Sequence, residues 1–253
     1  PMGMGGFGSR QTITAGSSAH IAAIEVKEKI LKIAAHILEA SEEDLEIDGT
    51  EVRVKGVPDM SVSLGRVAHE VAGTPGYALP EGITPGVEST QNFLTDPLCY
   101  CYSAHVCEVE ADPETGGVEI LNYKIVHDSG VLINPMIVTG QVVGGVTHGI
   151  GNAMFEWMGY DDDAQPVTTN FGEYLLPSAP EVPDFDVDFL QSPSPLNPLG
   201  VKGCGEGSTV PAAAAVVSAI EDALTPFGVH ITDAPITPAR LVELIAAGKA
   251  DAA

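Results

Sequence analysis

One acidic residue stands in a setting suited to chemistry. Glu206 has a glycine on each side within residues 200–208, a run that holds four glycines. Glycine lets the backbone bend and lets a ligand approach closely. Ser208, Thr209 and Pro211 are typical of a helix start, so we expect the carboxylate just before a helix N-terminus, whose field favours its ionised form. It could act there as a general base. Alternatively, it only complements the helix dipole.

Two further glycine-rich segments lie far from this one in the sequence. Residues 3–12 combine glycines with Ser9 and Arg10 before a long helical pattern, and residues 127–145 follow a predicted strand. A Gly/Ser-rich loop that enters a helix is suited to holding an anionic group, although residues 3–12 could instead be a disordered tail. If these segments converge with residues 199–209, they form a cradle for one large anionic ligand.

Composition excludes several classes of function. The 253 residues include 35 Asp and Glu against 11 Lys and Arg, a formal net charge of -24, so nucleic-acid binding is not expected. Such acidity suits a crowded cytoplasm or a docking face for a basic partner subunit. The four cysteines, Cys99, Cys101, Cys107 and Cys204, lack zinc or iron–sulfur spacing. They predict reduced thiols in the cytoplasm, and no apolar run predicts a membrane span.

Hydrophobic periodicity predicts an α+β fold without a Rossmann βαβ unit. Helices are expected over residues 20–40, 62–71, 136–158, 212–224 and 237–248. Strands are expected over residues 45–47, 52–54, 100–110, 118–126, 183–189 and 229–231, with a long loop over 72–97. Five glycines fall within residues 140–151 of the third helix. Each costs about 1 kcal/mol relative to alanine, so we expect close packing there against another backbone or a flat ligand.

Four motifs together resemble those of the molybdenum hydroxylases, the xanthine dehydrogenase and aldehyde oxidase family. The likeness is strongest to aerobic carbon-monoxide-dehydrogenase-type large subunits and bacterial N-heterocycle dehydrogenases. The motifs are Gly8-Ser9-Arg10, then Asp128-Ser129-Gly130 with residues 133–135 and 140–145, then residues 200–206, then residues 231–238. They cover nearly the whole chain but about the C-terminal third of a family large subunit.

The resemblance implies a particular domain and cofactor. It implies the second molybdopterin-binding domain of the large subunit, with two α+β subdomains, roughly residues 1–97 with part of the C-terminal region, and residues 98–253. The family carries molybdenum on a pterin dithiolene, usually as the cytosine dinucleotide in bacteria, without protein ligands to the metal. The residues that map onto cofactor-contacting loops are Gly8, Ser9, Arg10, Asp128, Ser129, Asn134, Gln141, Lys202, Gly203, Cys204 and Gly205. Many relatives have cysteine where Ser129 stands.

The implied reaction is hydroxylation of an electrophilic carbon, in an aldehyde or an N-heteroaromatic ring, with oxygen from water. Glu206 maps onto the family's catalytic base. Electrons would pass to separate iron–sulfur and FAD subunits, in a complex that is a dimer overall. The upstream half of the subunit is absent, so a separate or cleaved polypeptide must supply it, and the chain alone should not turn over. The alternatives are a carbon monoxide dehydrogenase fragment and a non-catalytic scaffold that has lost the cofactor. A general phosphate-binding module is disfavoured because Gly-x4-Gly-Lys-Ser/Thr is missing.

Overall fold

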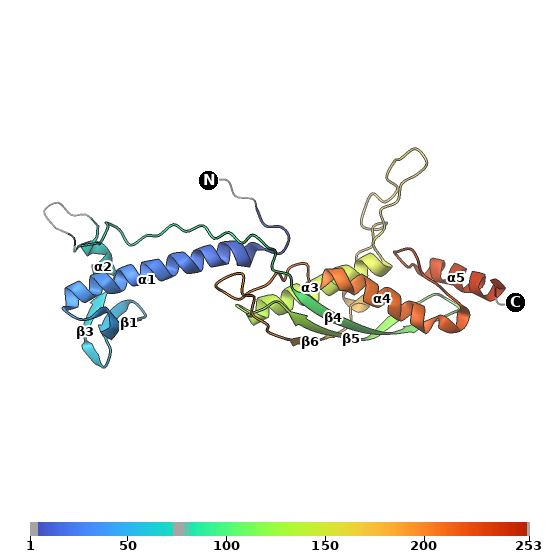
Figure 1. Ribbon diagram of the computed structural model, residues 1–253. Helices are drawn as coiled ribbons and strands as arrows, with labels where there is room; N and C mark the ends of the chain where they lie inside the picture. The colour runs from blue at the N-terminus through green and yellow to red at the C-terminus, as the bar shows by residue number, and fades with distance from the viewer. Residues whose placement is uncertain (1–4, 73–78, 80, 252–253) are drawn as a thin grey trace. The chain divides into compact units, whose positions relative to one another are not determined.

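The computed structural model describes residues 5–72, 79 and 81–251 (Figure 1). The chain forms two compact units, one of Thr14–Leu94 and one of Pro1–Ile13 with Thr95–Ala253. Each unit packs helices on a three-stranded sheet, which confirms the predicted α+β class. The resemblance implies a first subdomain of roughly residues 1–97 with part of the C-terminal region, whereas the compact units group residues 1–13 with residues 95–253. The family's subdomain division stays a prediction.

The Thr14–Leu94 unit is a helix over an antiparallel meander. Its elements are α1 (Ser17–Leu38), β1 (Leu45–Asp48), β2 (Glu51–Val54), β3 (Val57–Ser63) and α2 (Leu64–Glu70), with the sheet order β1-β2-β3. Ile30, Ile33, Ala34 and Ile37 recur at helical spacing and place one stripe of α1 against the core. The sequence analysis missed β3, because Pro58 and Asp59 interrupt its alternation and its pairing with β2 shifts register at Arg53/Val54.

The second unit carries the residues of chemical interest. Its sheet has the order β4-β5-β6, formed by β4 (Tyr102–Ala111), β5 (Val118–Asp128) and β6 (Phe185–Phe189), with β6 parallel to β5. The predicted hairpin of β4 and β5 is confirmed. Its helices are α3 (Pro135–Met154), α4 (Thr209–Ala223) and α5 (Pro238–Asp251), and α3 and α4 lie side by side over the sheet (Figure 1). Tyr123 and Ile125 of β5 belong to the same buried core as Val146 and Ile150 of α3.

Close helix packing explains two of the glycines in α3. A Cβ on Gly149 would overlap that of Ala212 in α4, and one on Gly145 would lie 3.1 Å from the Thr209 backbone nitrogen. The two helix backbones therefore approach at these positions, as the glycine content predicts. Gly144 faces open space instead, so packing does not account for it.

Two element predictions need correction. Residues 229–231 do not form a strand; they are an irregular segment before α5, and Val229 and Ile231 are apolar because they are buried against the helices. The third helix ends at Met154 rather than near residue 158, because Phe155 and Glu156 both donate backbone hydrogen bonds to the Gly151 carbonyl. Among the described residues, no helix has the length and apolar character needed to cross a membrane.

Candidate cofactor-binding and active site

The three glycine-rich segments meet within the second unit. Ser9, from the first segment, hydrogen-bonds Glu206 in the third. Asp128, from the middle segment, forms an ion pair with Lys202. Gln141 of α3 lies close to Gly205, since a Cβ on that glycine would be 3.4 Å from the amide nitrogen of Gln141. Segments remote in the sequence therefore form one cluster around the loop that precedes α4.

Ser9 holds Glu206 at two points. The Ser9 hydroxyl donates to Glu206 Oε2 at 2.7 Å and accepts from the Glu206 backbone N–H at 2.9 Å. One hydroxyl thus uses both its donor and an acceptor on the same residue. Thr209 and Val210 in the first turn of α4 donate to the Glu206 carbonyl. The exposed carboxylate is therefore fixed at the N-terminus of α4, where the helix dipole favours negative charge.

Gly203 and Gly205 let the loop close against Ser9. A Cβ on Gly203 would lie 3.1 Å from the Ser9 Cβ, and one on Gly205 would lie 3.5 Å from the Ser9 hydroxyl. The Gly203 N–H also donates to the Cys99 carbonyl at 2.9 Å. Side chains at these positions would crowd the contact that orients Glu206.

Cys101 and His127 lie directly beneath the loop. A Cβ on Gly207 would be 2.5 Å from Cys101 Sγ and 2.7 Å from His127 Cε1. His127 is fully buried, and burial lowers the pKa of its imidazole, with Asp128 acting weakly in the opposite direction. The imidazole is therefore a neutral, rigid support for the backbone next to Glu206.

Ser208 occupies the N-cap position of α4 but does not cap the helix with its side chain. Its hydroxyl instead lies 3.5 Å from His127 Nδ1. The sequence places Ser208 correctly at the helix start, while the side-chain cap typical of serine is replaced by this contact with the buried imidazole.

Asp128 and Lys202 tie the middle segment to the loop. Lys202 Nζ lies 2.9 Å from Asp128 Oδ2 and 2.6 Å from the Ser192 hydroxyl, which also hydrogen-bonds Asp128. Burial opposes ionisation of Asp128, but hydrogen bonds from Ser192, Lys202 and the Gly130 N–H outweigh it and hold the pKa of this carboxyl well below its ordinary value. In this structure both charges are directed at each other.

The turn after Asp128 also packs against the loop that contains Lys202. Gly130 has a φ of +72° and bridges to Val201, and a Cβ there would overlap the Gly200 carbonyl oxygen. The neighbouring Ser129 is buried, and its hydroxyl makes no hydrogen bond to a nitrogen or oxygen atom of the residues that the structure describes. Burial, and more weakly the nearby Cys101, raise the pKa of the Cys204 thiol, while the Ser129 hydroxyl acts in the opposite direction, so the thiolate form of Cys204 is disfavoured.

The remaining predicted residues have identifiable positions. Gly8 is exposed with a φ of +60°, and the Arg10 guanidinium lies 4.0 Å from the centre of the Phe7 ring. Asn134 caps α3, because its side-chain oxygen accepts from the Ile137 N–H at 3.2 Å. Gln141 is exposed on α3, beside Gly205.

A second polar cluster lies next to His127 between the sheet and the helices. His105 of β4 is hydrogen-bonded to the Tyr123 hydroxyl at 2.9 Å and to the Ser103 hydroxyl at 2.7 Å. Burial and the neighbouring His127 lower the pKa of His105 to about 4. Sequence reasoning missed His105, His127, Cys101 and Ser192, although strand alternation through Tyr123 and Ile125 predicts that His127 points inward.

The residues present fit a bulky anionic group of the molybdopterin kind. The cluster combines the N-terminus of α4 with the buried hydroxyl of Ser129, which makes no hydrogen bond to a nitrogen or oxygen atom of the described residues. Within the described part of the chain, no group of three or more His, Cys, Asp or Glu residues could hold a metal ion.

Comparison with known proteins gives the family. The molybdopterin cofactor-binding domain family matches residues 1–183, and the chain belongs to this family. This agrees with the resemblance in the glycine-rich motifs. The Glu206 loop lies beyond the matched residues, and the longer alignments below extend over it.

Individual relatives cover almost the whole chain. It is 39% identical over 242 residues to the 6-hydroxypseudooxynicotine dehydrogenase complex subunit gamma of Paenarthrobacter nicotinovorans. That alignment covers 95% of this chain and 30% of the relative. It is 35% identical to the carbon monoxide dehydrogenase large chain of Afipia carboxidovorans, over 88% of this chain and 27% of the relative. The structure of quinoline 2-oxidoreductase from Pseudomonas putida 86 superimposes with a TM-score of 0.85 and 37% identity, over 96% of this chain and 31% of that one. The chain thus spans about 30% of the length of the relatives it matches.

Proposed function

We propose that this chain is the molybdopterin-binding catalytic portion of a multi-subunit molybdenum hydroxylase, with Glu206 as the catalytic base. The observation that carries the proposal is the contact of Ser9 with Glu206, which joins two glycine-rich segments and holds an exposed carboxylate at a helix N-terminus. A carboxylate oriented in this way can accept a proton from a nucleophile placed beside it.

The residues of this chain would bind the cofactor and orient the catalytic base. Gly203 and Gly205 allow the loop to close against Ser9, which orients Glu206. The buried Ser129 hydroxyl, which makes no hydrogen bond to a nitrogen or oxygen atom of the described residues, would bind a polar atom of the cofactor. When bound, the molybdenum–pterin group supplies the redox chemistry and activates the oxygen derived from water. The cytosine dinucleotide form of the cofactor, the iron–sulfur and FAD partner subunits, and a cytoplasmic location belong to the same proposal.

The substrate class that we propose is an N-heteroaromatic compound. The relative named for 6-hydroxypseudooxynicotine is 39% identical, and the solved quinoline oxidoreductase is 37% identical, against 35% for the carbon monoxide dehydrogenase large chain. Oxidation of carbon monoxide is the competing activity, and the test below includes it.

The test uses the natively purified complex that contains this chain. We expect about one molybdenum per chain by metal analysis, together with turnover of an N-heteroaromatic such as quinoline. Glu206→Gln should retain the molybdenum and lower kcat by about 100-fold or more, the usual contribution of a general base. Glu173→Gln, which changes an exposed carboxylate elsewhere in the same unit, is the control.

Each failure has a distinct meaning. Full molybdenum with undiminished turnover in Glu206→Gln would show that Glu206 is not the base. A natively purified complex without molybdenum would support the non-catalytic scaffold. Turnover of carbon monoxide, with none of quinoline, would overturn the proposed substrate class.

A further inference from the structure

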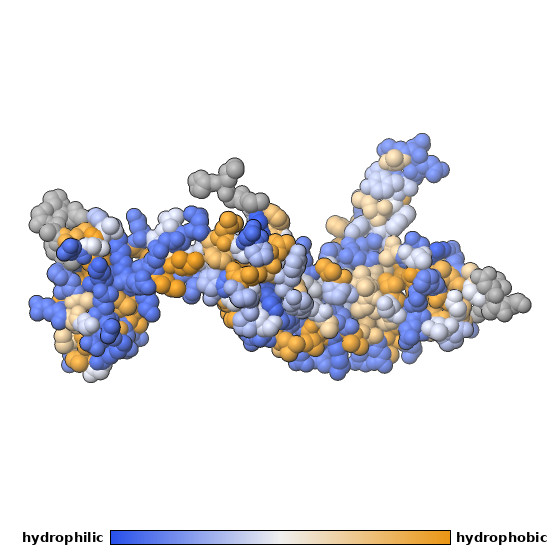
Figure 2. All heavy atoms as spheres, viewed as in Figure 1, coloured by the Kyte–Doolittle hydropathy of each residue, from blue (hydrophilic) through white to orange (hydrophobic). Residues whose placement is uncertain are grey.

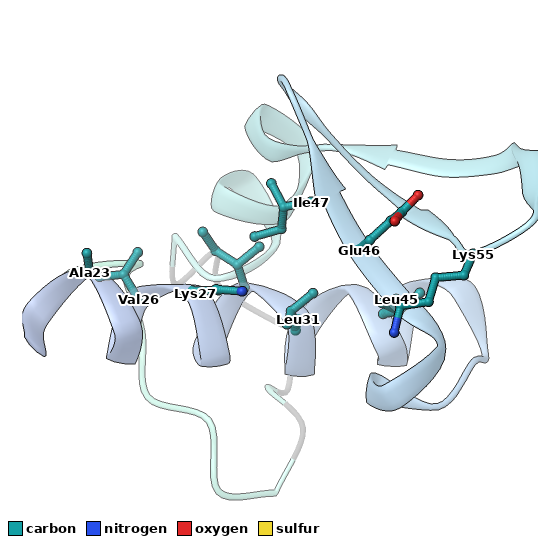
Figure 3. A pocket seen from close by; sticks show the side chains of 9 residues that line it. Ala23, Val26, Lys27, Leu31, Leu45, Glu46, Ile47 and Lys55 are labelled. Atoms are coloured by element: carbon teal, nitrogen blue, oxygen red, sulfur yellow. The ribbon is translucent and has the colours of Figure 1, made fainter. Parts of the chain in front are cut away.

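A groove runs along the free edge of β1 in the Thr14–Leu94 unit. Within the part of the chain that the structure describes, β2 is the only strand that pairs with β1. The groove, of about 590 Å³, lies between this edge and α1. Val26 and Ile30 line it from the helix and Ile47 from the strand; Figure 3 shows Val26 on the helix and Ile47 on the strand beside it.

The backbone of β1 has unused hydrogen-bonding groups on this side. The Lys55 backbone N–H donates to the Asp44 carbonyl at 2.8 Å. This bond fixes which residues of β1 direct their backbone groups toward β2 and which direct them away. In an antiparallel pair every second residue bonds the partner strand, so Leu45 and Ile47 direct their backbone groups away from β2. The Leu45 N–H already donates a hydrogen bond to the Glu42 carbonyl. The Leu45 C=O and both backbone groups of Ile47 therefore face the groove.

Helix α1 provides an apolar floor beyond the three strands. Val26 continues the apolar stripe of α1 one turn before Ile30, towards the helix N-terminus. From Ala23 to Leu31 the helix rises about 12 Å, which equals the length of about four strand residues. Figure 2 shows hydrophobic side chains at the surface along α1. The groove therefore has the length and the floor for one further strand.

The charges at the groove favour an acidic occupant. Lys27 of α1 and Lys55 after β2 both line it, in a chain with only 11 Lys and Arg against 35 Asp and Glu. Lys55 Nζ donates to the Glu43 carbonyl at 2.6 Å, which fixes the ammonium in place without neutralising its charge. The one acidic lining residue, Glu46, accepts a hydrogen bond from Arg53 Nε at 3.0 Å, so its charge is already paired. A second copy of this chain that paired β1 with β1 would bring the same lysines together, which disfavours self-association.

We propose that the β1 groove binds an extended strand, with apolar residues alternating with acidic ones, as a fourth strand of this sheet. The occupant is a segment of the large subunit outside these 253 residues, since this chain spans only 30% of the length of its relative from Paenarthrobacter nicotinovorans. Such strand addition uses main-chain hydrogen bonds for affinity and alternate side chains for specificity. This inference does not depend on the proposed catalytic role of Glu206.

The probe is a synthetic octapeptide of alternating valine and glutamate, added to the 253-residue chain and followed by amide hydrogen exchange and by titration of NMR amide shifts. We expect exchange of the Ile47 amide to slow by about tenfold or more on binding. Lys27→Glu should weaken binding about fivefold or more by removing one attraction and adding a repulsion. Lys124→Glu, on the exposed surface of the other unit, is the matched control and should bind the peptide normally.

Val26→Asp should abolish binding by placing a charge on the apolar floor. The circular dichroism spectrum checks that this variant folds, and Ala23→Asp, at an exposed position on the same face, repeats the test. Equal binding of an alternating valine–lysine peptide, or protection of residues elsewhere instead of Ile47, would overturn the proposal. Protection of Ile47 that grows with protein concentration without peptide would assign the groove to a second copy and also overturn it.

Discussion

The Ser9 hydroxyl donates to the Glu206 carboxylate at 2.7 Å and accepts from the Glu206 backbone N–H at 2.9 Å, across a sequence separation of 197 residues. Ser9 adopts a φ of +56°, a left-handed conformation that costs a residue with a side chain about 1 kcal/mol. The two hydrogen bonds offset this cost. The conformation of the N-terminal loop and the position of the carboxylate are therefore coupled.

Removing the Ser9 hydroxyl should release Glu206. Ser9→Ala loses both hydrogen bonds, each worth about 1 kcal/mol, so we expect faster amide exchange at Glu206 and a free energy of unfolding lower by about 1–2 kcal/mol. In the natively purified complex, kcat should fall about 5- to 30-fold if Glu206 is the base, because the carboxylate is then poorly oriented.

Ser9→Gly separates orientation from backbone strain. It also lacks the hydroxyl but adopts positive φ freely, so its free energy of unfolding should exceed that of Ser9→Ala. Both variants should show the same loss of kcat. A Ser9→Ala protein with wild-type exchange at Glu206 would show that the two bonds do not hold the loop.

A methyl group at position 207 should displace the loop. In Gly207→Ala the new Cβ would meet Cys101 Sγ and His127 Cε1 at 2.5 and 2.7 Å. The cost of such overpacking is about 1–3 kcal/mol, and urea unfolding measures it. Because Gly207 follows Glu206 directly, amide exchange at Glu206 should also accelerate.

Gly144→Ala is the matched control for a glycine replacement in the same unit. Gly144 lies within α3 and a Cβ there meets nothing within 4 Å, so this change should be neutral or stabilise by up to about 1 kcal/mol. Adding Cys101→Ala to Gly207→Ala should recover part of the stability by making room. If the double variant loses the sum of the two single effects, the crowding explanation is wrong.

Local patterns predicted the parts of the site that depend on neighbouring residues. Alternation through Tyr123 and Ile125 marks the inward face of β5, and Pro135 marks the start of α3. The glycines around Glu206 predicted a bend before a helix, which the structure confirms. The motifs also predicted the family, which the match of the family model over residues 1–183 confirms.

The partners of those residues were not predictable, because they depend on how distant segments pack. Asp128 meets Ser192 across 64 residues, and no local feature of either residue indicates this contact. The ion pair between Asp128 and Lys202 was likewise not indicated by any local feature, and the contact of these residues with the cofactor stays a prediction. Periodicity also predicted a strand at residues 229–231, since buried irregular segments carry the same apolar pattern.

The Asp128–Lys202 pair should matter far more to stability than an exposed pair. The side chains of Lys202 and Asp128 are 9% and 11% exposed, whereas those of Lys124 and Asp186 are 66% and 63% exposed. Lys202→Met leaves the carboxylate buried without its cation, so we expect a loss of about 3–5 kcal/mol in the free energy of unfolding. Lys124→Met should lose about 1 kcal/mol or less.

A double variant tests whether the unpaired charge causes the loss. Asp128→Asn added to Lys202→Met removes the buried charge, and urea unfolding should show partial recovery. Similar losses for Lys202→Met and Lys124→Met would contradict the importance of burial at this pair.

The buried histidines predict that stability falls on mild acidification. Burial and the neighbouring His127 lower the pKa of His105 to about 4, below its ordinary value of 6.5. Between these values the unfolded chain binds a proton that the folded chain does not, so stability rises with pH and is lost as pH falls from about 6.5 towards 4. His105 should account for a loss on the order of 2 kcal/mol, and His127, with its lowered pKa, adds in the same direction.

Urea unfolding at intervals from pH 7 to pH 4 measures this dependence. His105→Gln should reduce the slope of the free energy of unfolding against pH, and His105→Gln with His127→Gln should reduce it further, even if both variants are less stable at pH 7. The exposed His148→Gln controls for the loss of a histidine elsewhere in the unit. The slope of the free energy of unfolding against pH in His105→Gln could equal that of the unmodified chain. In that case the fold does not keep the His105 imidazole neutral. Its hydrogen bonds with Tyr123 and Ser103 would then not shield it from solvent.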